Sequence, residues 1–132
     1  MTILIELKLP YPPSVNHYWG TRATYKNKHM IPQKYLTQKA KDYAKEVQQC
    51  VFVQKGQKAY NLPIEVKVGV YVPDKRKRDL DNILKGLFDS LTKASVYADD
   101  SLIEKLEVEK LGFKKGGEVQ VKIQPKEATI EQ

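Results

Sequence analysis

β-Branched residues occupy every second position of the segment between Pro63 and Pro73, and this spacing constrains the fold more than any other feature of the sequence. The five residues are Ile64, Val66, Val68, Val70 and Val72. Side chains two apart share one face of a β-strand, so the segment predicts a strand with one wholly apolar face. A chain of 132 residues has room for one core that buries this face, and we expect residues 1–132 to form a single domain.

Two helices are predicted from apolar residues that recur at three- and four-residue steps. Over residues 79–93 these are Leu80, Ile83, Leu84, Leu87, Phe88 and Leu91. A helix earlier in the chain, the first of the two, is predicted over residues 34–54, ending near Gly56. Residues 11–32 hold no single period and interleave aromatic with basic side chains, so they are typical of a long loop or an irregular hairpin.

Alternating apolar residues predict three further strands, over residues 3–9, 103–111 and 118–123. The last two flank Gly116-Gly117, and these glycines can take the positive φ that a hairpin turn requires. The charged tail, residues 126–132, is expected to fray. The order strand, loop, helix, strand, helix, strand, strand predicts a small α/β (α+β) domain with a mixed sheet and two main helices on one face.

The charge balance indicates an acidic partner. Lysine and arginine total 23 against 16 acidic residues, a net charge of +7, which favours nucleic acid. No apolar run approaches the roughly 18 residues of a membrane helix, so no membrane association is expected. The single cysteine, Cys50, fits a reducing, cytoplasmic setting. No glycine-rich phosphate-binding motif occurs, so no nucleotide cofactor is expected.

The densest chemical feature is the run Lys75-Arg76-Lys77-Arg78, which leads directly into Asp79-Leu80-Asp81-Asn82. Residues two apart on an ideal helix lie about 200° from one another, so Asp79 and Asp81 can face one site only if Asp79 lies at the cap or before it. A structural interpretation is also open, with Asp79 as N-cap and Lys85 as the i+4 partner of Asp81. The basic run could equally be a solvated loop.

Asp99-Asp100, in the connection after the predicted helix, adds two adjacent carboxylates. A turn or an N-cap would explain them. However, Mg²⁺ prefers carboxylate oxygens and completes its coordination with substrate phosphate. Asp79, Asp81 and one of Asp99 or Asp100 could therefore form an acidic centre with a basic rim, a combination that indicates phosphodiester hydrolysis.

The same residues carry a family resemblance. Arg78-Asp79-Leu80-Asp81-Asn82 with Lys85, followed by Thr92-Lys93-Ala94 and Asp99-Asp100, resembles the RusA family of Holliday junction resolvases. The opening Leu9-Pro10-Tyr11-Pro12-Pro13-Ser14-Val15-Asn16-His17-Tyr18 is similar to that family's N-terminal motif. The resemblance covers nearly the whole chain, and it implies a bacterial or phage-encoded protein.

The resemblance implies a homodimeric endonuclease that makes paired nicks in four-way DNA junctions during recombination and repair. Its cofactor would be Mg²⁺, with Mn²⁺ able to take its place. By matching positions, Asp79, Asp81 and Asp100 would bind the metal and Lys85 would be the catalytic-site lysine. Ser95 stands where the family commonly has glycine after the helix, a departure that bears on how the helix ends.

DNA contacts are expected from two segments. The first is the basic run Lys75, Arg76, Lys77 and Arg78, in which Lys75 and Lys77 stand where the family often has arginine. The second comprises Asn16, Tyr18, Trp19 and Arg22. Two rival hypotheses remain at this point: a nonenzymatic nucleic-acid-binding protein, and a nuclease for another branched DNA.

Overall fold

The computed structural model describes residues 4–14, 19–74 and 79–126. The described elements are β1 (Ile5–Leu9), β2 (Trp19–Lys26), β3 (His29–Leu36), α2 (Gln38–Val53), β4 (Ile64–Val72), the 3₁₀ turn η1 (Leu80–Ile83), α3 (Leu84–Lys93), the 3₁₀ turn η2 (Asp100–Leu102), β5 (Ile103–Phe113) and β6 (Glu118–Pro125). They form a four-stranded mixed sheet, a separate two-stranded sheet and two helices, which confirms the predicted fold class.

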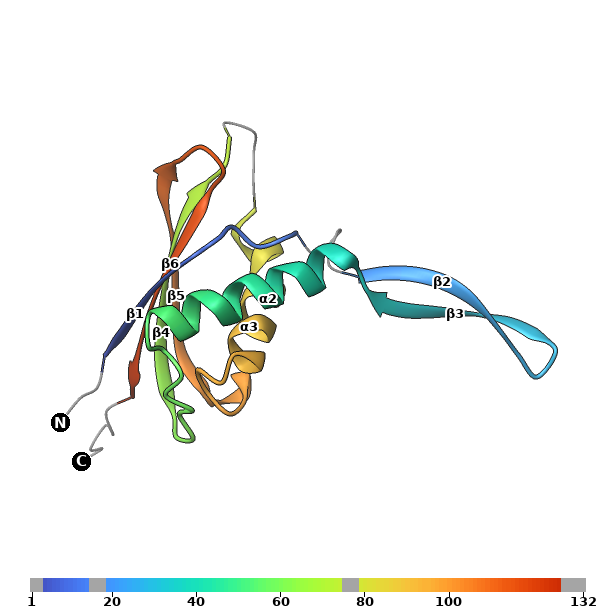
Figure 1. Cartoon of the computed structure of the whole chain (residues 1–132), viewed down its shortest axis with the longest axis horizontal. Coiled ribbons are helices and arrows are strands. Elements are labelled where there is room, and N and C mark those ends of the chain that lie inside the picture. The colour runs from blue at the N-terminus through green and yellow to red at the C-terminus, as the bar shows by residue number, and fades with distance from the viewer. Residues whose placement is uncertain (1–3, 15–18, 75–78, 127–132) are drawn as a thin grey trace, which may run out of the picture.

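The predicted apolar strand is the centre of the main sheet, whose order is β1-β6-β4-β5. β4 pairs antiparallel with β6 and parallel with β5. Its alternating apolar residues are buried, and they form one core cluster with β1, β6, α2 and α3. Both helices lie on one side of the sheet (Figure 1), as the sequence predicts, and the opposite face carries polar side chains such as Lys67 and Lys122.

The predicted hairpin between the last two strands is wrong in its pairing. The glycines do take positive φ, +82° at Gly116 and +74° at Gly117, but β5 and β6 lie on opposite sides of β4 and do not pair with each other. The connection crosses the end of β4, where Lys114 N–H donates to Val72 at 3.0 Å. β4 is the strand with a wholly apolar face and takes the interior position, whereas the charge-rich β5 takes the edge.

The first helix starts later than predicted. Thr37 is the N-cap of α2, and its side chain accepts a hydrogen bond from Ala40 N–H, while residues 34–36 complete β3. Leu36 fits both the helical spacing and the strand, so the spacing alone places the start of the helix too early. The predicted end near Gly56 is close: α2 ends at Val53, Lys55 takes a φ of +59°, and Gly56 lies against Leu7.

The segment for which the sequence left open a loop or a hairpin is a hairpin. β2 and β3 pair over their full length, from Trp19 with Leu36 to Lys26 with His29. Asn27 and Lys28 form the two-residue turn with φ of +50° and +63°, the signature of a type I′ turn. The hairpin projects away from the main sheet (Figure 1), and none of the hairpin side chains that the structure describes belongs to the core.

The two ends of the chain lie mostly outside the described residues. Of the predicted frayed tail, residues 126–132, only Lys126 is described, and its N–H donates to Pro63 at 2.9 Å. Within the described residues, no helix combines the length and the apolar character that a membrane span needs.

Candidate active site

The predicted second helix begins as a 3₁₀ turn, and this start places the first two carboxylates. Asp79 is the N-cap residue of η1, with extended backbone at φ −91° and ψ 131°. Asp79 therefore precedes the helical backbone, which is the condition for sharing a site with Asp81 in the first turn. Its carboxylate makes no capping hydrogen bond, so the N-cap interpretation does not account for the side chain. Both carboxylates are exposed.

Lys85 lies on the exposed flank of α3, while Leu87 and Leu91 on the same helix are fully buried. The Lys85 ammonium is 3.4 Å from the carboxylate of Asp89, one turn further along. It therefore pairs with Asp89 and not with Asp81, contrary to the structural interpretation of the spacing. With 48% of the Lys85 side chain exposed, the ion pair leaves the ammonium open to an incoming anion.

The turn after α3 keeps helical capping despite the missing glycine. Ser95 takes a left-handed φ of +63°. Its N–H donates to Thr92, and the N–H of Val96 donates to Leu91, both at 3.1 Å. These two bonds form the Schellman motif that usually has glycine at this position. The chain consequently turns back along the helix and leads to Asp99 and Asp100.

Tyr97 anchors this returning segment. It is 1% exposed, and its hydroxyl donates to the carbonyl of Phe88 at 3.0 Å. Burial raises the pKa of the Tyr97 hydroxyl, and the nearby charges of Asp100, Asp89 and Asp99 raise it further. Tyr97 thus ties α3 to the loop that carries the adjacent carboxylates.

Asp99 and Asp100 have different environments. Asp99 is the N-cap of η2, where its carboxylate accepts hydrogen bonds from the N–H and the hydroxyl of Ser101. The bond from the Ser101 hydroxyl, followed by that from its N–H, lowers the pKa of Asp99. In contrast, the Asp100 carboxylate has no hydrogen bond or ion pair within the described residues. This difference favours Asp100 as the ligand and explains Asp99 as a cap.

The predicted carboxylates are distributed over two turns and are not gathered into one preformed group. Asp79 and Asp81 belong to η1 at the amino end of α3, whereas Asp100 belongs to η2, after the turn at the other end. Among residues 4–14, 19–74 and 79–126, no three His, Cys, Asp or Glu side chains form a group that could hold a metal ion.

Most of the predicted DNA contacts fall on segments outside the described residues. Lys75, Arg76, Lys77, Arg78, Asn16 and Tyr18 lie outside the described residues. Trp19 and Arg22 belong to β2 of the projecting hairpin.

Sequence reasoning missed two residues of this region. Asp89 could have been found by extending the i+4 spacing from Lys85 along the helix. Tyr97 has no such signal, because its role depends on the chain folding back onto Phe88.

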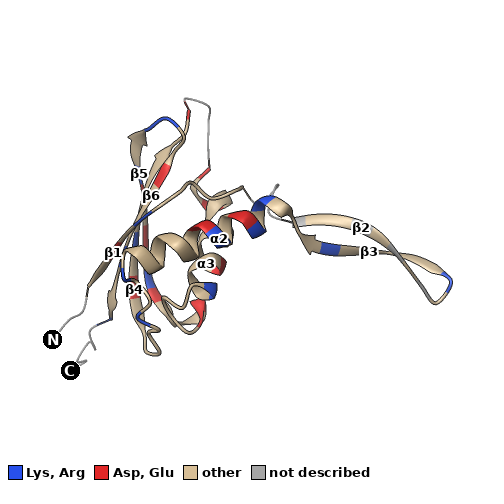
Figure 2. Ribbon diagram, viewed as in Figure 1, with Lys and Arg blue, Asp and Glu red and all other residues tan. Residues whose placement is uncertain are grey.

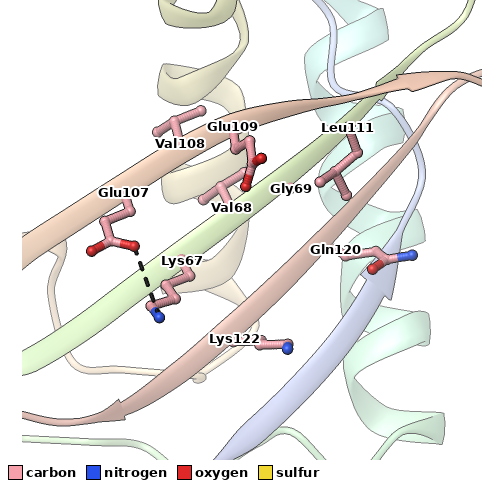
Figure 3. A pocket seen from close by; sticks show the side chains of 9 residues that line it. All are labelled: Lys67, Val68, Gly69, Glu107, Val108, Glu109, Leu111, Gln120 and Lys122. Atoms are coloured by element: carbon pink, nitrogen blue, oxygen red, sulfur yellow. Dashed lines mark ion pairs between the residues drawn. The ribbon is translucent and has the colours of Figure 1, made fainter.

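A hollow of about 400 Å³ lies on the polar face of the sheet (Figure 3), and no residue of η1 or η2 lines it. It is crossed by the ion pair of Lys67 with Glu107 at 3.8 Å. Leu111 fills one end, over Gly69. It contains none of the predicted site residues.

Comparison with known proteins gives the decisive observation. The model of the family described as "Endodeoxyribonuclease RusA" matches residues 10–124. The chain belongs to the RusA family. The match includes both turns that carry the candidate carboxylates, the whole of α3, and the projecting hairpin.

Curated RusA proteins are similar over nearly their full length. A crossover junction endodeoxyribonuclease of Enterobacteria phage HK97 is 39% identical over 118 residues, which cover 89% of this chain and 92% of the relative. Proteins of the same name from Enterobacteria phage 82 and from Escherichia coli K12 are each 29% identical over the same shares. RusA proteins of phages and of bacteria are thus both similar to this chain.

Proposed function

We propose that this RusA-family endodeoxyribonuclease is a crossover junction resolvase, which makes paired nicks in four-way DNA junctions. The observation that carries the proposal is the 39% identity to a crossover junction endodeoxyribonuclease across 92% of that relative. The net charge of +7 supports a polyanionic substrate. Exposed carboxylates beside an exposed lysine supply the groups that phosphodiester hydrolysis uses.

The proposed metal ligands are Asp79, Asp81 and Asp100. Their chemistry suits Mg²⁺, or Mn²⁺ in its place, because both ions prefer carboxylate oxygens. None of the three carboxylates has a hydrogen-bond or ion-pair partner within the described residues, so metal binding would not have to break one. Because the three do not form one group there, an ion shared by all of them would have to bring Asp100 together with Asp79 and Asp81. A divalent ion bound by them would supply Lewis-acid stabilisation of the phosphate and an activated water molecule.

The chain's own contribution is the placement of Lys85. Its ammonium is held by Asp89 on the exposed flank of α3, one helical turn from Asp81. A cation fixed there stabilises the negative charge that grows on the phosphate oxygens during cleavage. The ion pair with Asp89 keeps the ammonium on this flank of the helix.

The proposal extends to a homodimer and to a basic rim. Four-way junctions are nearly two-fold symmetric, so a C2 dimer would present two such sites to opposing strands. The basic run from Lys75 to Arg78 directly precedes Asp79, so its charges would be available to the same DNA. The compartment expected from the sequence is the cytoplasm.

The test replaces each proposed ligand with asparagine in the full-length protein. Asp79→Asn, Asp81→Asn and Asp100→Asn should each abolish cleavage of a synthetic four-way junction in Mg²⁺, while junction affinity and Tm stay close to wild type. Asp99→Asn is the matched control, because its carboxylate caps η2, and it should retain cleavage. Calorimetric titration of the same variants with Mn²⁺ measures ligand loss without depending on activity.

The rival functions make different predictions. A nonenzymatic DNA-binding protein would bind junctions and cut no DNA in any divalent ion. A nuclease for another branched DNA would cut a flap or a Y-shaped duplex faster than the four-way junction. Full Mg²⁺-dependent activity in Asp79→Asn would refute the assignment of the metal ligands.

A further inference from the structure

The β2–β3 hairpin, residues Trp19–Leu36 and here called the arm, projects away from the main sheet (Figure 1). Two strands of eight residues each, at about 3.3 Å per residue, give it a length of about 26 Å. No arm side chain described in the structure belongs to the core, and Tyr25 and Met30 are 67% and 64% exposed. An isolated two-stranded hairpin is marginally stable in water, so the arm is suited to act against another surface.

The charge of the arm is of one sign. Between Leu7 and Lys41 the sequence contains no aspartate or glutamate, although the whole chain has 16 acidic residues. The arm carries Arg22, Lys26, Lys28 and Lys34. Figure 2 shows the same contrast: basic and acidic segments alternate over the main body, whereas the arm has basic segments alone. A surface without carboxylates complements a polyanion.

The turn at the tip of the arm places a lysine where glycine is favoured. A type I′ turn needs positive φ at both central residues, and Asn-Gly is its preferred sequence. This arm has Asn27 and Lys28, with Lys28 at φ +63°. A non-glycine residue in that conformation costs on the order of 1 kcal/mol. The sequence thus keeps a positive charge at the tip at the expense of turn stability.

The exposed edge of β3 is poorly suited to pairing with a protein strand. Counting from the closing pair, Lys26 with His29, the pair of Ala23 with Pro32 is a non-hydrogen-bonded one. The Pro32 ring therefore lies on the outer edge, where it removes a donor and obstructs a neighbouring strand. Pairing of a strand from a second protein with the outer edge of β3 is consequently disfavoured.

We propose that the arm binds a duplex arm of the DNA substrate as a two-stranded ribbon, with Lys28 and Lys34 contacting backbone phosphates. A major groove about 12 Å wide admits such a ribbon. By the strand register, Lys34 shares one face of the ribbon with Tyr25 and Met30, and Lys28 lies at the tip. The proposal rests on the proposed function, because it takes that DNA as the partner, and it adds a contact surface outside the carboxylate site.

The test compares the salt dependence of DNA binding in two double variants. Lys28→Gln/Lys34→Gln removes two charges from the arm. Lys67→Gln/Lys122→Gln removes two charges from the polar face of the sheet, where each lysine is paired with a glutamate. All four lysines lie at described surface positions, so both variants should fold, and their net charges are equal. Affinity for a four-way junction and for a linear duplex is measured between 50 and 200 mM salt.

Each lost phosphate contact lowers the slope of log affinity against log salt by about 0.9. The arm variant should therefore lose about 1.8 units of slope, so that the wild type weakens about 12-fold more than the variant over this range. Both DNA shapes should be affected alike, and the sheet-face control should keep the wild-type slope.

Three results would overturn the proposal: an unchanged slope in the arm variant, an equal loss in the control, or a shift of oligomeric state in sedimentation, which would make the arm a protein contact.

Failure of the arm proposal can be distinguished from failure of the proposed function. If the wild type cuts no DNA but the slope difference holds, the arm binds DNA and the resolvase proposal fails. If cleavage is normal and the slope is unchanged, the arm proposal fails alone.

Discussion

Replacing Ser95 with glycine should stabilise the protein. Ser95 occupies the residue after the C-cap of α3, at φ +63°. The two bonds that close this turn, Ser95 N–H to Thr92 and Val96 N–H to Leu91, are made by the backbone and would persist in the variant. The serine side chain is exposed, so its removal costs no packing.

The magnitude follows from two opposing effects. A residue with a Cβ in the left-handed conformation costs about 1 to 2 kcal/mol. Glycine loses about 0.5 to 1 kcal/mol more backbone entropy than alanine on folding. The net gain is therefore about 0.5 to 1 kcal/mol. With an unfolding entropy of about 2.1 cal/mol/K per residue over 132 residues, this gain raises Tm by about 2 to 4 °C.

The assay is thermal unfolding by circular dichroism, with urea unfolding at 25 °C as a second measure. Ser95→Ala is the matched control, because it removes the hydroxyl but keeps the Cβ, and its Tm should equal that of the wild type. Lys55→Gly repeats the experiment at the end of α2, where Lys55 takes a φ of +59°. A Ser95→Gly variant no more stable than Ser95→Ala would refute the argument from backbone strain.

Three further changes have defined outcomes. Gly117→Ala should destabilise by more than about 1 kcal/mol in urea unfolding, because the residue has a φ of +74° and its Cβ would lie 2.7 Å from the Tyr11 Cβ; unchanged stability would contradict this. Ser101→Ala should raise the pKa of Asp99, measured by carboxyl NMR titration, because it removes the hydroxyl that chiefly lowers that pKa. The resulting loss of stability should be present at neutral pH and vanish as the pH falls below the Asp99 pKa. Lys85→Ala should lower single-turnover junction cleavage by roughly 10² with little change in affinity; a normal rate would reduce Lys85 to a surface ion pair with no catalytic part.

The elements predicted best from the sequence are those that bury one face against the core and expose the other. β4 has strict alternation, and the helix from residue 79 has an apolar stripe that includes Leu87 and Leu91, both fully buried. In each case the periodicity reports directly which face contacts the core. The carboxylates before this helix were recognisable for the same reason, since the start of the stripe fixes where the helical backbone begins.

The errors arose where local pattern does not determine partners. β5 and β6 follow one another across a glycine turn, yet β4 lies between them. This order depends on which strand occupies the position between its neighbours in the sheet, and the contacts that decide it join residues far apart in the chain. The β3 strand of the hairpin gave no clear period because its residues are exposed on both faces. A strand pair without a buried face has no reason to alternate.

The contrast between elements with a buried face and the exposed arm also separates the proposed cleavage site from the proposed DNA contact of the arm. The core-facing stripe of α3 fixes the helix whose exposed flank carries Lys85 and whose two ends lead to the carboxylates. A substitution in that stripe should therefore reduce stability and cleavage together. Lys28 and Lys34 are exposed and lie outside the core, so changes at either lysine can alter affinity while stability stays constant. Because the two regions depend on different parts of the fold, their effects on the transition-state free energy of cleavage, measured as kcat/KM, should add, with little coupling between them.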